Sequence, residues 1–191
     1  MLSRSLPGPV SRWSCIALAV FGAAATIASL NAAEAPTEAT TPEAPFPADA
    51  PRIAKAEARR QAEVLHSAMH TTLHLVHHRY YTEDEGLPIP AAVVEEVFRD
   101  VESEQPVRLR WLVVEGQAMN TDHRARTEFE HAAVEALKSG KTAYEQVEAG
   151  IYRRAGAIRL TNACLKCHVP DRKSTEDRIA GLIISLPVQE K

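Results

Sequence analysis

The pentapeptide Cys164-Leu165-Lys166-Cys167-His168, close to the end of the chain, has the pattern C-x-x-C-H. Two thiols at this spacing can add to the two vinyl groups of one haem, and the imidazole that follows is then placed to ligate the iron. The sequence therefore predicts one covalent haem c per chain. Cys164 and Cys167 would form the thioether bonds, and His168 would be the proximal iron ligand.

The first 33 residues have the features of a secretory signal peptide. A basic start with Arg4 and Arg12 precedes an apolar run over 15–30, and small residues follow up to Ala33, where cleavage is predicted. The alternative is an uncleaved membrane anchor, but the run has 16 residues where a spanning helix needs roughly 20. We therefore expect a periplasmic or otherwise exported protein, which contacts a membrane only if this segment is retained.

Cleavage after Ala33 would change both the charge and the cysteine content of the chain. The formal net charge goes from −3 to −5, which gives no electrostatic reason to expect nucleic acid as a partner. Cys15 is lost, so a zinc ribbon would lack its second pair of ligands. A thioredoxin-like pair begins a helix, and Val169-Pro170 argues against a helix starting there. A structural disulfide would not require His168.

The remaining chain divides into a linker over 34–52 and a domain over 53–191. The linker contains five prolines among Ala, Thr and Glu, and we expect it to be extended and mobile. Periodicity and turn residues predict helices over 53–81, 90–104 and 128–139, a helical turn over 142–148, and strands over 107–114, 151–160 (broken at Gly156) and 178–188. This order predicts an α+β fold with long N-terminal helices on a small antiparallel sheet.

Five of the eight histidines lie within 13 residues of the first predicted helix: His66, His70, His74, His77 and His78. At 100° per residue, three of them (His66, His70 and His77) border the apolar face, while His74 and His78 fall on the solvent side. A haem iron takes a second axial ligand or keeps an open site. We take His77 as the candidate distal ligand, with His70, His66 and Met119 as alternatives. A surface role for each histidine also fits the pattern.

The motif and the segment after it resemble those of the periplasmic, single-haem, PAS-like c-type haem domains, which occur alone or fused to bacterial sensor modules. The residues that carry the resemblance are 163–168 and the later run Ala180-Gly181-Leu182-Ile183-Ile184-Ser185-Leu186-Pro187. The resemblance implies a PAS-like sheet around the haem, with haem-binding roles for Cys164, Cys167 and His168. It spans about residues 55–188.

The chain also departs from this family. Val169 stands where the family has Gly, and the loop around Asn120 lacks the family's Arg-Asn-Pro pattern. Some members use a cysteine as the distal ligand, and the cleaved chain has no third cysteine to supply. The distal ligand is therefore another residue, or the site is open.

These features favour redox or small-ligand sensing through the haem. The expected partner is a separate redox or signalling protein, and a small ligand could also bind at the iron. The alternative is a periplasmic electron carrier. An enzyme such as a peroxidase ranks last, because no distal acid–base pair with an arginine stands out.

Overall fold

The computed structural model describes residues 44–81, 86–118, 120–168 and 174–190, and for residues 166–168 it describes the backbone alone. In chain order the elements are α1 (Lys55–Arg79), α2 (Pro90–Glu104), β1 (Arg108–Val113), a 3₁₀ turn (Thr121–His123), α3 (Glu128–Lys138), β2 (Ala143–Glu148), β3 (Ile151–Leu160), α4 (Asn162–His168) and β4 (Arg178–Pro187).

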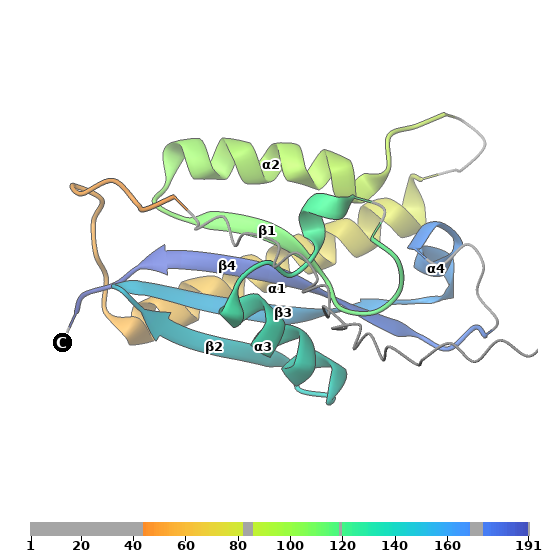
Figure 1. Ribbon diagram of the computed structural model, residues 1–191. Helices are drawn as coiled ribbons and strands as arrows, with labels where there is room; N and C mark the ends of the chain where they lie inside the picture. Colours follow the sequence, from red (N-terminus) through yellow and green to blue (C-terminus); the bar gives the residue numbers. More distant parts are fainter. Residues whose placement is uncertain (1–43, 82–85, 119, 169–173, 191) are drawn as a thin grey trace, which may run out of the picture. The chain divides into compact units, whose positions relative to one another are not determined.

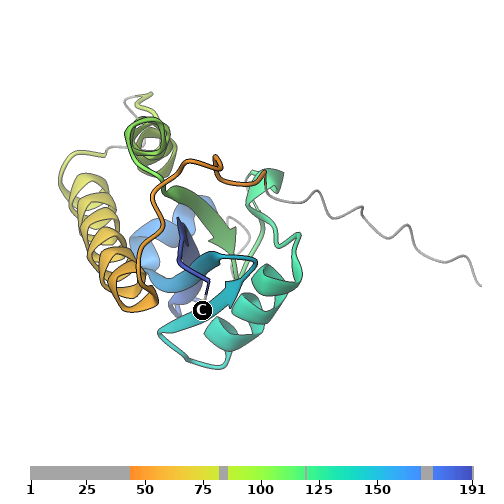
Figure 2. The same cartoon turned by 90° about the vertical axis from the view of Figure 1, so that its left-hand side faces the viewer.

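The strands form one antiparallel sheet in the order β1-β4-β3-β2, with helices on both faces (Figure 1). Successive side chains of a strand point to opposite faces, and β4 is buried on both. Leu182 and Ile184 pack with α1 and α2, whereas Ile183 packs with α3. Figure 2 shows α1 and α2 on one face of the sheet and α3 on the other. The predicted α+β fold, with long N-terminal helices on a small antiparallel sheet, is confirmed.

Local sequence explains how the helices begin and how closely they pack. Helix α1 contains neither Pro nor Gly, and its Ala58 and Ala62 are completely buried, so their small side chains let the helix approach the sheet. Helix α2 has Pro90 at its first turn, where a missing N–H costs nothing. Thr127 and Glu130 form the predicted capping box at the start of α3.

Two of the sequence expectations for the sheet were wrong. Residues 142–148 do not form a helical turn, because β2 occupies this region and pairs with β3 through a two-residue hairpin. Ala149 (φ 48°) and Gly150 (φ 69°) both have positive φ, which is the type I′ geometry that matches the twist of paired strands. Gly156 does not break β3, since it pairs with Leu182 on one side and Ala143 on the other.

Residues 44–52, which the sequence assigns to the linker, make defined contacts with the sheet. Arg108 donates hydrogen bonds to the carbonyl oxygens of Ala44 and Pro45, and its guanidinium lies 4.1 Å from the ring centroid of Phe46. Arg52 donates to the carbonyl oxygen of Gly150 at 3.2 Å. The predicted signal peptide lies outside the described residues. None of the helices described is both long and apolar enough to cross a membrane.

Candidate functional site

The C-terminal half of α1 faces α4 across a cavity of about 60 Å³. Cys164, which is half-buried with a free thiol, lies on its wall. Four of the five clustered histidines line the same cavity: His70, His74, His77 and His78. The fold thus brings together a thiol of the C-x-x-C-H motif and imidazoles from a helix about 90 residues earlier in the chain.

A second cavity of about 290 Å³ adjoins the first. The two share five apolar wall residues: Leu73, Ile89, Ala91, Ile158 and Leu160. Trp111 also lies on the wall of the second cavity, and its indole N–H donates to the carbonyl oxygen of Ala91 at 3.2 Å. Together the cavities offer apolar surface next to sulfur and nitrogen donors, a combination typical of ligand sites that hold a metal or cofactor.

Polar groups are concentrated at one side of the second cavity. His123 Nε2 lies 2.6 Å from an Oε1 of Glu95 in α2, and 3.3 Å from Nδ2 of Asn120. This group joins α2 to the loop before α3, and sequence reasoning missed it because Glu95 and His123 are far apart in the chain. In the sequence, the polar residues of the segment 117–123 were the feature that could have pointed to this group. Met119, an alternative distal ligand, lies outside the described residues.

Helix α4 positions the motif. Its first turn is held by the carbonyl oxygen of Thr161, which accepts from the N–H groups of Cys164 at 2.8 Å and Leu165 at 3.1 Å. The Leu165 side chain is 1% exposed and is part of the main core, so α4 is anchored between the two cysteines. The expectation that no helix starts at the motif was wrong. Helix α4 begins at Asn162, two residues before Cys164, and holds all five residues of the motif up to His168. A proline restricts the residue before it and ends a helix there, so Pro170 does not prevent a helix over the residues that precede it.

His66, another alternative ligand, is not among the residues that line either cavity. Its ring packs on Gly156 of β3, where even a Cβ would lie 2.5 Å from Nε2. Burial lowers the pKa of His66, and the guanidinium of Arg154 lowers it further. Burial also lowers the pKa of His70, with a smaller contribution from His74. Both rings therefore favour the neutral form, in which a nitrogen lone pair can bind a metal.

The candidate distal ligand His77 is half-buried on the cavity wall. Its ring centroid lies 5.4 Å from that of Tyr81, which lines the same cavity. His74 and His78 are exposed, as the helical periodicity predicts, although they also reach the cavity rim. His131 lies exposed on α3 and lines neither cavity.

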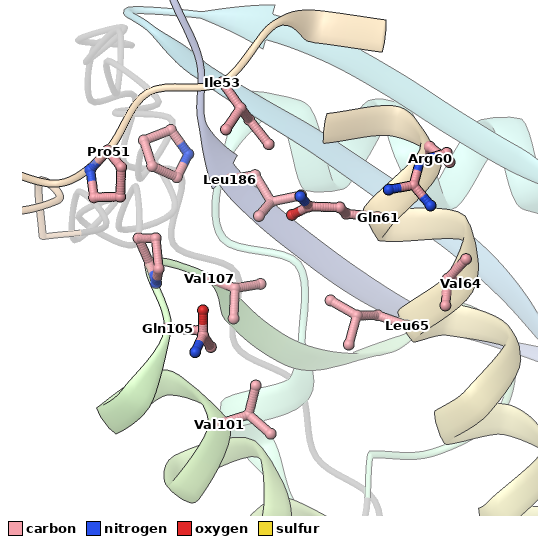
Figure 3. Close-up of a pocket in the computed structure, with 12 residues that line it drawn as sticks. Pro51, Ile53, Arg60, Gln61, Val64, Leu65, Val101, Gln105, Val107 and Leu186 are labelled. Carbon is pink, nitrogen blue, oxygen red and sulfur yellow. The ribbon is translucent and has the colours of Figure 1, made fainter. Parts of the chain in front are cut away.

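A larger cavity of about 500 Å³ lies farther towards the N-terminus of α1, between α1, the end of α2 and the ends of β1 and β4 (Figure 3). Its wall is mainly apolar, with Val64, Leu65, Val101 and Leu186 facing the space beside Gln61. None of the described residues on its wall is a cysteine or a histidine, so this part of the wall offers neither a thiol nor an imidazole.

The fold and the site define an α+β protein with one antiparallel sheet between helices and an apolar cavity that combines thiol and imidazole groups. The chain belongs to the Tll0287-like family, whose model, described as Tll0287, matches residues 51–182. The match shows the family, while the PAS-like, c-type character that the resemblance implies stays a prediction.

A solved structure supports the fold. The crystal structure of the cyanobacterial haem protein Tll0287 is similar with a TM-score of 0.53 and 14% sequence identity, over 72% of this chain and 99% of that one. At this identity the similarity shows the fold alone. Among curated proteins, no sequence matches the chain.

Proposed function

We propose that this chain is an exported haem protein that holds one haem c covalently and uses it in redox or small-ligand sensing. The observation that carries the proposal is the position of Cys164, which shares the wall of an apolar cavity with four imidazoles of α1. The haem-protein title of the similar structure and the family match support the same cofactor.

The residues present fit a haem. The apolar side chains shared by the two cavities, among them Ile89, Ile158 and Leu160, would contact the porphyrin faces. Cys164 and Cys167 would form the thioether bonds, and His168 would ligate the iron from the motif side. When bound, the haem would supply a one-electron redox centre and a binding site for small ligands.

Helix α1 is our proposed source of the distal ligand. His77 and His70 are half-buried on the cavity wall, whereas His74 and His78 are exposed. A ligand held in a half-buried position loses less side-chain freedom on binding than an exposed one, because packing has already restricted it. This favours His77 and His70. The packing of His66 on Gly156 argues against His66.

The sensing role is supported by the second cavity, which combines apolar surface with the hydrogen-bonding groups of Asn120 and His123. Such a mixture suits a small ligand next to a cofactor. The several imidazoles of α1 favour the alternative, a periplasmic electron carrier, because a permanent second axial ligand stabilises six-coordinate iron in both oxidation states. In either case a separate redox or signalling protein would be the partner.

The proposal is tested by expressing the full chain together with haem-maturation machinery. We expect haem that stays with the polypeptide on a denaturing gel, and a mature N-terminus at Glu34 in the exported protein. The double variant Cys164→Ser/Cys167→Ser should lose covalent haem, and haem retained through this change would refute attachment at the motif. Spectra of both oxidation states with carbon monoxide then separate the two roles. A spectrum shifted by the ligand supports sensing, and an unmoved six-coordinate spectrum supports electron transfer.

A further inference from the structure

His74 and His78 form a pair of exposed, stacked imidazoles at the rim of the cavity beside Cys164. Their ring centroids are 6.1 Å apart and their planes differ by 6°. The proposed haem site takes at most one histidine from α1, and it favours the half-buried ones. The exposed pair is therefore left without a role by the proposed function.

The spacing of the pair suits a shared metal ion. Residues four apart lie on the same side of a helix, with a rise of about 6 Å between them. A metal held by two imidazoles lies about 2.0–2.1 Å from each nitrogen. Because His74 and His78 are exposed and their rings are already nearly parallel, side-chain rotations can direct both nitrogens at one ion without disturbing the core.

His70 continues the same row of histidines but cannot complete this site. It is eight residues from His78, which corresponds to about 12 Å along the helix axis, too far for one ion to bind both. In agreement, the described residues contain no group of three or more His, Cys, Asp or Glu side chains able to hold a metal ion. Among the described residues, the geometry therefore gives two protein ligands, with water completing the coordination.

We propose that His74 and His78 bind a divalent transition-metal ion at the rim of the cavity, with higher affinity for Cu²⁺ than for Zn²⁺. Imidazole is a good ligand for both ions, and Cu²⁺ generally binds a given nitrogen site more tightly. Among the described residues that line this cavity, Arg159 is the one lysine or arginine, and its charge is paired with Asp177. That ion pair reduces the repulsion that a bound metal ion would experience.

The experiment is a titration of the haem-loaded full chain with Zn²⁺ by calorimetry and with Cu²⁺ by electron paramagnetic resonance. We expect one site per chain with nitrogen ligands. His74→Ala and His78→Ala should each weaken binding by at least about tenfold, since losing even an outer-shell partner costs that much at many metal sites. His131→Ala is the matched control, because it removes a single exposed histidine of α3.

Two results would overturn the proposal. One is binding by the His74→Ala or His78→Ala variant with the wild-type affinity. The other is a change in the haem absorption bands on metal addition, which would mean that the ion competes for an axial ligand and does not occupy a separate site. Failure of the proposed function is seen in a separate measurement, as the absence of covalent haem on the denaturing gel. The metal titration can still be carried out on the haem-free chain.

Discussion

The imidazole of His66 lies against the backbone of Gly156 in β3, so closely that a Cβ on residue 156 would lie 2.5 Å from Nε2. This contact joins α1 to the sheet at a point where a larger residue would hold the two apart. It also explains why a glycine stands inside a continuous strand. Since β-strands lose stability at glycine, such a residue usually marks a close approach of another group.

The first prediction concerns this contact. Gly156→Ala should lower the free energy of unfolding by about 1–3 kcal/mol, because the added methyl group overpacks the space under His66. Denaturant unfolding measures the change. In the background of His66→Ala the same substitution should cost less, as expected for two residues in direct contact. An equal cost in both backgrounds would show that His66 does not restrict this position.

The second prediction concerns the pH dependence of stability. The pKa of His66 is lowered from its usual 6.5 by burial and by Arg154, with His70 contributing as well. Below pH 6.5 the unfolded chain therefore binds a proton that the folded chain takes up only at lower pH. The free energy of unfolding should fall as the pH drops through this window, with a slope of at most about 1.4 kcal/mol per pH unit from this group.

The same unfolding measurements on His66→Gln provide the check. This variant should show a shallower loss of stability between pH 6.5 and the lowered pKa, because it carries no titrating ring at this position. The control His131→Gln alters an exposed histidine and should keep the wild-type slope. A wild-type slope in His66→Gln would assign the pH dependence to other groups.

The third prediction concerns Glu130, which is 8% exposed. Its carboxylate forms an ion pair with Arg110 and accepts hydrogen bonds from the N–H groups of Arg126 at 2.6 Å and Thr127 at 3.0 Å. Arg110 in turn donates to the carbonyl oxygens of Asp122 and Arg124, next to His123. Glu130 thus supports both the start of α3 and the loop on the wall of the second cavity.

Glu130→Gln should therefore lower the free energy of unfolding by about 1–3 kcal/mol, because the charge of Arg110, whose side chain is 28% exposed, would lose its carboxylate partner. The matched control is Glu128→Gln, an exposed carboxylate in the same first turn, which should change stability by less than about 0.5 kcal/mol. Equal effects of the two substitutions would show that Glu130 stabilises the protein only as a negative charge at the start of α3 and not through its pairing with Arg110.

Local signals in the sequence were sufficient for most elements of the fold. Pro90, the capping box at Thr127 and the 3–4 periodicity of α1 each act over a few residues, so helix positions could be read directly. Strand β2 was missed because its side chains are partly polar and lie at the sheet edge, where burial gives no clear alternation.

The site was less predictable, because it depends on packing between distant segments. Helical periodicity ranked His66 with the buried-side histidines. It could not show that His66 packs on the sheet while His70 and His77, on the same side of α1, line the cavity. The contact between Glu95 and His123 has the same origin, since it forms only where α2 and the later loop meet.

The fourth prediction uses this division of α1. His77 lies on the cavity wall with Cys164, while His66 lies on Gly156. His77→Ala should therefore remove the low-spin band from the absorption spectrum of the haem-loaded protein, because the iron would lose its distal ligand. His66→Ala deletes a histidine of the same helix at a position outside the cavity, and it should leave the band unchanged. Both spectra are recorded at equal haem content.

If the low-spin band survives in His77→Ala, the other histidine variants identify the distal ligand. If His77→Ala keeps the band and His70→Ala loses it, the distal ligand is His70, one of the two half-buried histidines on the cavity wall. If neither variant changes the band, the ligand is neither of the two half-buried histidines, and His74→Ala, His78→Ala and Met119→Ala are the next variants to record. A loss of the band in His66→Ala would contradict the placement of His66 on Gly156, because it would mean that the His66 ring of the wild-type protein enters the cavity and binds the iron.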